Sequence, residues 1–220
     1  MIALDLIANI ITPLKPTDTV AWASSLMLDF KTNHLPVVSP DLTFLGLVSD
    51  DDLIEAKPQD TLHTIALSSY ANFVYQQQHI YDVIRTVYEQ NLSIIPVLDD
   101  SKKYQGLITL NTLVQNMASL QSSSQAGAII VLELGPHDNS LAFIAQIIEA
   151  QDTQILSTYT RHIPQSTQTE LTIKVNKTDV GQILVAFTRY KIDVKAIFNH
   201  QDKYNNVTDR YQSLINYLSF

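Results

Sequence analysis

The sequence repeats itself once, with an offset of 60 residues and no gap. Residues 34–53 read HLPVVSPDLTFLGLVSDDDL, and residues 94–113 read IIPVLDDSKKYQGLITLNTL. The alignment places Pro36 on Pro96 and brings the glycines of the two blocks together. Repeats of this length usually form stacked units that share one core. We therefore expect the first 120 residues to fold as two copies of one supersecondary unit.

An amphipathic helix precedes each block. Apolar residues stand at positions 20, 23 and 27 and again at 80, 83 and 87, the i, i+3, i+7 spacing of one helix face. Ser49 and the three aspartates after it indicate another helix start, where the helix dipole favours acidic residues. Each repeat, 1–60 and 61–120, therefore reads β-α-β-β-α.

The second half has a different pattern. Residues 121–127, QSSSQAG, are small and polar and form the clearest linker. The strands and helices that we predict beyond it are strands at 128–134, 155–163, 169–175 and 194–200, and helices at 140–150 and 179–191. This β-α-β-β-α-β order predicts a ferredoxin-like antiparallel sheet with both helices on one face. A last helix, at about 207–218, completes the domain 128–220. The whole chain thus combines α/β and α+β parts.

Composition narrows the possible functions. The 220 residues include no cysteine and carry a formal net charge of −8. The absence of cysteine excludes thiolate chemistry. The negative net charge argues against binding to nucleic acid or to an anionic membrane surface, because either needs a basic face on the protein. No signal peptide or membrane span is evident, so we expect a cytoplasmic protein. No catalytic motif is present, and no two of the six histidines stand three or four apart. We expect no enzyme, no metal and no cofactor.

The two repeats resemble a tandem CBS-domain pair, the regulatory Bateman module named after cystathionine β-synthase. The resemblance rests on the LPVV…GLVSDDDL and IPVL…GLITLNTL blocks with the helix before each, and it covers about residues 1–120. The second half resembles an ACT domain, an amino-acid-sensing regulatory fold. There GPHDNSLAFIAQIIEAQDTQILS stands where that family has an Asp-Arg-Pro-Gly loop. A CBS pair followed by an ACT-like domain is similar to the acetoin-utilisation regulatory protein family.

The CBS resemblance implies a ligand site. In that family, a Gly-hydrophobic-hydrophobic-Ser/Thr-X-X-Asp stretch binds the ribose and phosphate of an adenosine nucleotide, and Gly46 to Asp52 match it here. Adenine would lie against the segments around residues 11–12 and 34–36. The implied ligand-binding residues are Ile11, Thr12, His34, Leu35, Pro36, Ser49 and Asp52. However, Ser49-X-X-Asp52 also has the spacing of a helix capping box, and both interpretations stay open.

Three departures from the family patterns change what the resemblance implies for ligand binding. In the second repeat Thr112 stands where the aspartate should be, so only the first site keeps an acceptor for the ribose hydroxyls. Asp50 and Asp51 add like charge near the phosphates, at a cost of about 1–4 kcal/mol, which favours AMP or S-adenosylmethionine over magnesium-free ATP. In the ACT-like loop, Asp138 is kept but the arginine and glycine are missing. An ordinary helix N-cap explains that loop equally well, and we expect no amino-acid binding there.

The sequence therefore predicts a non-catalytic regulatory protein that senses an adenosyl ligand. Exposed sheet edges predict a homodimer, as does the common association of CBS pairs and ACT domains into dimers. The sequence does not identify the protein that this dimer regulates. A structural interaction module without a small-molecule ligand is the alternative. An enzyme whose active site comes together only from distant parts of the chain is a third interpretation.

Overall fold

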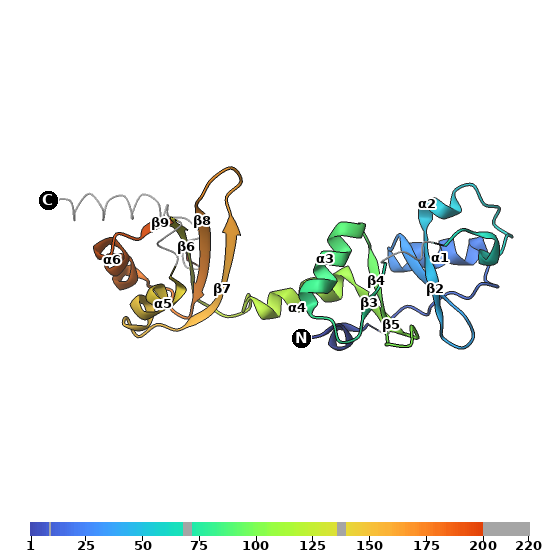
Figure 1. The fold of residues 1–220 in the computed structure, drawn as a ribbon, viewed down its shortest axis with the longest axis horizontal. Helices are drawn as coiled ribbons and strands as arrows, with labels where there is room; N and C mark the ends of the chain where they lie inside the picture. The colour runs from blue at the N-terminus through green and yellow to red at the C-terminus, as the bar shows by residue number, and fades with distance from the viewer. Residues whose placement is uncertain (9, 68–71, 136–139, 200–220) are drawn as a thin grey trace. The chain divides into compact units, whose positions relative to one another are not determined.

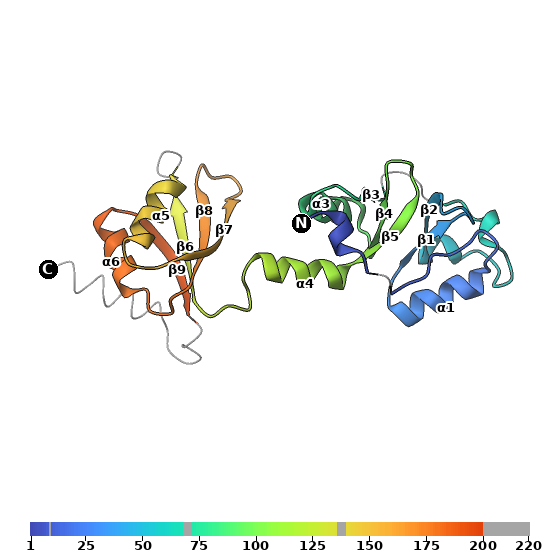
Figure 2. The same ribbon diagram turned by 90° about the horizontal axis from the view of Figure 1, so that it is seen from below.

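The computed structural model describes residues 1–8, 10–67, 72–135 and 140–199. The chain divides into two compact units, Met1–Asn116 and Met117–Phe220 (Figures 1 and 2). The elements of the first unit are η1 (Ala3–Leu6), α1 (Val20–Phe30), β1 (His34–Val38), β2 (Phe44–Ser49), α2 (Asp50–Leu53), η2 (Leu62–Thr64), β3 (Val74–Tyr75), α3 (Ile80–Gln90), β4 (Ile94–Leu98), β5 (Tyr104–Thr109) and α4 (Leu110–Leu120), which ends beyond its boundary. Those of the second are β6 (Ala128–Leu134), α5 (Leu141–Glu149), β7 (Ile155–His162), β8 (Thr169–Val175), α6 (Gly181–Arg189) and β9 (Asp193–Asn199).

The sequence repeat is also a repeat in backbone geometry. In the first hairpin Val37 pairs with Gly46, and in the second Val97 pairs with Gly106, each pair followed at once by a bulge. The two glycines have φ angles of 152° and 153°, which are strained for residues with a Cβ atom. A glycine at this place in both repeats is therefore explained by the bend of the hairpin.

The helix that precedes each hairpin buries the predicted face. In α1, Val20, Ala23 and Met27 are buried, and in α3, Ile80 and Val83 are completely buried. Both helices end at a residue in the left-handed conformation, as the C-terminal caps of helices often do. Each repeat thus closes its hydrophobic layer with one amphipathic helix.

The two repeats exchange the segments that precede their helices. Ala3 donates its N–H to the carbonyl of Gln78, and Ala8 donates to that of Leu107, so η1 packs on the second repeat. Conversely, Leu62 donates to the carbonyl of Asp18, which places η2 on the first repeat. The repeats therefore form one unit rather than two independent domains.

The first predicted strand of the first repeat is reduced to a single residue. Leu14 forms an isolated parallel bridge with Val37, through one hydrogen bond to each side of it. Pro13 and Pro16 have no N–H to donate, which explains why pairing does not extend. The corresponding strand of the second repeat, β3, has two residues.

The second unit is a four-stranded antiparallel sheet with the strand order β7-β8-β6-β9. Helices α5 and α6 cover one of its faces (Figures 1 and 2). The core between them is built from every second residue of the central strands, such as Ile130 and Ile173, and from helix residues such as Ile144 and Phe187. The observed element order is β-α-β-β-α-β, as the sequence predicted.

Some predictions fall outside the described residues. These are the final helix at 207–218 and the ACT-like loop with Asp138. At the end of that loop, Ser140 accepts a hydrogen bond from the N–H of Phe143 (3.3 Å) and caps α5. Among the helices of the described ranges, none is long and apolar enough to cross a membrane.

Candidate functional site

The two repeats are joined at their hairpin turns. Tyr104 donates its N–H to the carbonyl of Leu42 (2.8 Å), and Phe44 donates to the carbonyl of Lys102 (3.3 Å). The Lys103 ammonium donates to the carboxylate of Asp41, and this bond, with those from Ser39 and Thr43, holds the pKa of Asp41 well below its usual value. These contacts hold the turns of the two hairpins against each other.

At the other end of the hairpins, Ser93 of the second repeat is hydrogen-bonded to the first repeat. Its hydroxyl lies 2.8 Å from Thr32 Oγ1 and 2.9 Å from His34 Nδ1, and it accepts from the N–H of Asn33 (3.0 Å). Burial lowers the pKa of His34, against the opposing effect of the three aspartates at 50–52. The imidazole thus lies half-buried between the repeats, where burial disfavours its protonated form.

A hollow of about 410 Å³ opens beside this cluster. The residues that line it are Asn33, His34, Ser49, Asp50 and Asp51 from the first repeat, and Gln90, Asn91, Leu92, Ser93 and Leu110 from the second. Ligand pockets commonly have volumes of about 300–1,000 Å³. Because both repeats contribute to the lining, a ligand that fills this hollow would contact both of them.

The predicted capping box is present at the start of α2. The N–H of Asp52 donates to Ser49 Oγ (3.2 Å), and Asp52 Oδ2 accepts from the N–H of Ser49 (2.8 Å). In the second repeat, the N–H of Thr112 donates to Thr109 Oγ1 (3.1 Å), and the two hydroxyls are 3.0 Å apart. The hydroxyl position is therefore built alike in both repeats, whereas only the first has a carboxylate beside it.

The structure brings part of the implied ligand site together. His34 and Ser49 line the hollow, and Asp52 is bonded to Ser49 without being a lining residue. Four other implied residues are not among those that line it. Leu35 and Pro36 are buried inside β1, Ile11 is buried, and Thr12 is exposed.

Sequence reasoning missed the contribution of the second repeat to this hollow. Asn91 and Ser93 follow α3 and occupy the positions of Lys31 and Asn33 in the alignment of the repeats. That alignment could have suggested that residues after both helices lie close together about a local two-fold axis. It gave no reason to expect that Ser93 would hydrogen-bond to His34.

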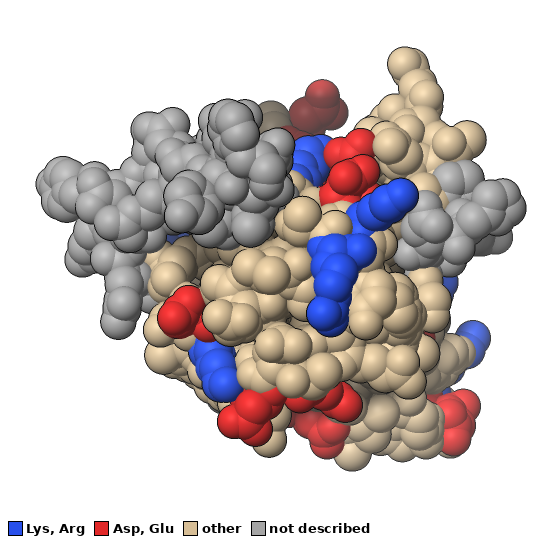
Figure 3. Space-filling view, turned by 90° about the vertical axis from the view of Figure 1, so that its left-hand side faces the viewer, with Lys and Arg blue, Asp and Glu red and all other residues tan. Residues whose placement is uncertain are grey.

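A metal site and a nucleic-acid-binding surface have less support among the described residues. No group of three His, Cys, Asp or Glu side chains there is placed to hold a metal ion. On the side of the molecule that Figure 3 shows, Lys and Arg lie among Asp and Glu and form no continuous basic surface. This distribution offers no phosphate-binding track on that side.

Comparison with known proteins identifies the first half of the chain. The family model of the CBS domain matches twice, at residues 5–59 and 68–119. These residues form a tandem CBS domain pair, as the sequence predicted. Such pairs are typically regulatory modules.

Two curated proteins match parts of this chain. Homoserine O-acetyltransferase of Methanocorpusculum labreanum is 28% identical over 110 residues, which are 50% of this chain and 23% of that protein. Inosine-5'-monophosphate dehydrogenase of Aquifex aeolicus is 24% identical over 184 residues, which are 81% of this chain and 37% of that protein. The chain thus spans well under half the length of these enzymes.

Solved structures of similar fold also include CBS pairs. A CBS domain pair/ACT domain protein from Thermotoga maritima has a TM-score of 0.49 at 18% identity, covering 54% of this chain and 98% of that chain. CBSX2 in complex with AMP has a TM-score of 0.46 at 21% identity, covering 54% of this chain and 96% of that chain. Because these TM-scores are low, the identification rests on the two family-model matches.

Proposed function

We propose that this chain is a non-catalytic regulatory protein whose CBS pair binds an adenosyl ligand in the hollow between its repeats. The observation that carries the proposal is the lining of the hollow, which combines His34 and Ser49 of the first repeat with Ser93 of the second. A ligand there favours one relative arrangement of the repeats, and this shift in population is the signal.

The lining also indicates which adenosyl ligand fits. Ser49 offers a hydroxyl, and His34, whose Nδ1 is engaged by Ser93, retains Nε2 for a ligand. Asp50 and Asp51 make the hollow negative, which opposes a triphosphate without magnesium. AMP or the cationic S-adenosylmethionine is therefore the preferred class. Ile11, Thr12, Leu35, Pro36 and Asp52 do not line the hollow and enter this proposal only through the family resemblance.

The ligand is tested by thermal unfolding of the whole chain with AMP, ADP, ATP, S-adenosylmethionine, NADH and amino acids. A ligand at 100 times its Kd adds about 2.7 kcal/mol of stability. Asp52→Asn keeps a side-chain oxygen that can accept from the N–H of Ser49 and so retains the cap, but it loses the charge. The family resemblance assigns Asp52 to the ribose hydroxyls. Since charge-assisted hydrogen bonds contribute about 1.5–3 kcal/mol, that assignment predicts a tenfold or greater loss of affinity in this variant.

Thr112→Ala is the matched control in the second repeat, and it retains the ligand-induced shift. We expect one adenosyl ligand per chain. Two equivalent ligands, or normal binding by Asp52→Asn, would refute the assignment of Ser49 and Asp52 to the ligand and leave them as a helix cap.

The capping box supports a second candidate function, a structural interaction module with no small-molecule ligand. Ser49 and Asp52 already satisfy each other's backbone donors, so the local structure needs no ligand to explain them. If no compound of the panel raises the melting temperature, the result favours this second function over the adenosyl sensor.

We also propose that the second unit is an ACT-like dimerisation domain that binds no free amino acid at its loop. Strands β7 and β9 are the edges of its sheet, and exposed edges favour pairing with a second copy. The protein regulated by the dimer stays unidentified, and the proposed location is the cytoplasm.

A further inference from the structure

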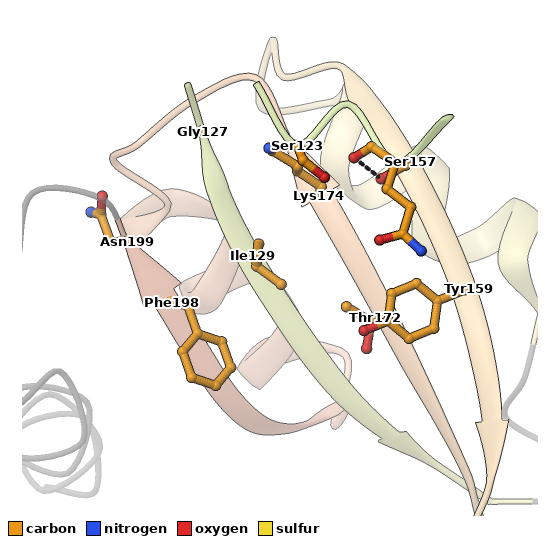
Figure 4. Close-up of a pocket in the computed structure, with 10 residues that line it drawn as sticks. Ser123, Gly127, Ile129, Ser157, Tyr159, Thr172, Lys174, Phe198 and Asn199 are labelled. Atoms are coloured by element: carbon orange, nitrogen blue, oxygen red, sulfur yellow. Dashed lines mark hydrogen bonds between the residues drawn. The ribbon is translucent and has the colours of Figure 1, made fainter. Parts of the chain in front are cut away.

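The second unit has a hollow of its own, on the sheet face opposite α5 and α6. It measures about 300 Å³ (Figure 4). The residues that line it are Gln121, Ser123, Gly127, Ile129, Ser157, Tyr159, Thr172, Lys174, Phe198 and Asn199. All four strands and the segment after α4 contribute to this lining, which we call the sheet hollow.

The segment after α4 is fixed over one end of the sheet hollow. Ser157 Oγ donates to the carbonyl of Gln121 (3.1 Å), and Lys174 Nζ donates to the carbonyl of Ser122 (2.6 Å). Ser157 and Lys174 are paired neighbours on β7 and β8. The turn is therefore anchored to the sheet at two adjacent points, and it encloses the lysine.

Lys174 is a buried cation, with only 8% of its surface exposed. Among the described residues, no carboxylate lies within ion-pair distance of it. Two acids on the same sheet face, Glu133 and Glu170, are engaged elsewhere, both by Lys195 and the latter also by Arg161. Glu170 stands four residues along β8, about 13 Å away at 3.3 Å per residue.

The negative charge of Glu170 is already balanced by two basic side chains. Lys195 and Arg161 donate to its carboxylate, and these bonds lower its pKa. An ammonium group has three donors, and the described contacts of Lys174 account for one of them. Because burying a charge without a counter-charge is unfavourable, the sheet hollow is electrostatically suited to an anion.

The rest of the lining is mixed: Ile129, Tyr159 and Phe198 offer apolar and aromatic surface, and polar side chains such as Gln121 and Thr172 lie among them. Tyr159 and Phe198 stand on opposite sides of the sheet hollow, with Ile129 and Thr172 between them (Figure 4). Both residues are about half exposed, at 53% and 58%, so their rings offer apolar surface to a ligand. A planar apolar body lying between them would cover this surface.

We propose that the sheet hollow binds a small organic monocarboxylate with a planar apolar body. The carboxylate accepts from the Lys174 ammonium, and the body lies over Ile129 between Tyr159 and Phe198. A single cation matches a single negative charge, which disfavours a nucleotide. The ammonium of a free amino acid would be repelled by Lys174. This site is separate from the CBS pair and does not depend on the function proposed for it.

Benzoate tests this site in the full-length chain, by titration calorimetry and by saturation-transfer NMR. Benzyl alcohol has nearly the same shape without the charge and serves as the ligand control. Lys174→Met keeps the aliphatic stem and removes the ammonium. A charge-assisted hydrogen bond is worth tenfold or more in affinity, so we expect Lys174→Met to bind benzoate at least tenfold more weakly and benzyl alcohol about as well.

Lys177→Met is the matched protein control. Lys177 also donates to a backbone carbonyl, that of Gln151 (3.1 Å), but it does not line the sheet hollow, and its replacement leaves benzoate binding unchanged. Phe198→Ala removes an exposed wall without altering the buried lysine, and it also weakens binding, even if Lys174→Met does not fold. The proposal is overturned if benzoate does not bind at about 10 mM, if benzyl alcohol binds equally well, or if Lys174→Met and Phe198→Ala bind normally.

Discussion

Gly127 is the position at which a single methyl group should destabilise the second unit most clearly. It precedes β6 and has a φ angle of 157°, and a Cβ atom added to it would lie 1.8 Å from the carbonyl oxygen of Val175. That oxygen belongs to the backbone of β8 and cannot rotate away, so Gly127→Ala must separate the central strands β6 and β8.

The expected loss can be worked out from two contributions. Overpacking a well-packed site costs about 1–3 kcal/mol, and a disfavoured backbone conformation costs about 1–3 kcal/mol. We therefore expect Gly127→Ala to lower the free energy of unfolding of the second unit by about 3 kcal/mol. For a domain of about 100 residues this corresponds to roughly 12–24 °C in Tm.

The assay uses the fact that the chain has one tryptophan, Trp22, which lies in α1 of the first unit. Circular dichroism follows both units during thermal unfolding, whereas tryptophan fluorescence follows the first alone. Gly127→Ala should shift part of the dichroism transition to lower temperature and leave the fluorescence transition in place.

Gly181→Ala is the matched control. Its Cβ would meet only the side chain of Asp179, at 3.3 Å, and alanine is favoured over glycine in a helix by about 1 kcal/mol. We expect Gly181→Ala to unfold at or slightly above the wild-type temperature. Wild-type stability of Gly127→Ala, or an equal loss in Gly181→Ala, would refute the steric argument.

Two further predictions concern His34 and assembly. Burial lowers the pKa of His34 in the folded chain below its ordinary value of 6.5, so on acidification the unfolded chain takes up a proton first. Stability of the first unit should therefore fall as pH drops through about 6.5, and His34→Gln should reduce this dependence in urea titrations followed by Trp22 fluorescence; identical pH profiles would contradict it. Light scattering at micromolar concentration should give twice the mass of one chain, and the mass of a single chain would exclude the proposed homodimer.

Much of the fold could be predicted from the sequence because the information is local. Helix faces such as that of Val20 and Ala23 follow from periodicity, and the two hairpins follow from apolar runs around polar turns. The repeat added a long-range constraint, since two matching segments must be covered in the same way. The order of most helices and strands in the described residues therefore follows from local sequence, with the first strand reduced to a bridge at Leu14.

The capping box shows the limit of spacing as evidence. Ser49 and Asp52 have the same spacing in a helix cap and in a nucleotide site, and the tertiary structure shows that the cap is formed. It also places Ser49 on a hollow that the second repeat completes. Local sequence could not distinguish these roles, because both use the same two side chains on one helical turn.

The tertiary structure alone decided which distant residues meet. The sequence determined the repeat, the helix faces and the strand order along the chain, since these depend on neighbouring residues. It did not determine the exchange of η1 and η2 between the repeats, the bond between Ser93 and His34, or the burial of Lys174 under the segment after α4. Each of these depends on side-by-side packing of segments far apart in the chain, for which residue type and spacing carry no signal.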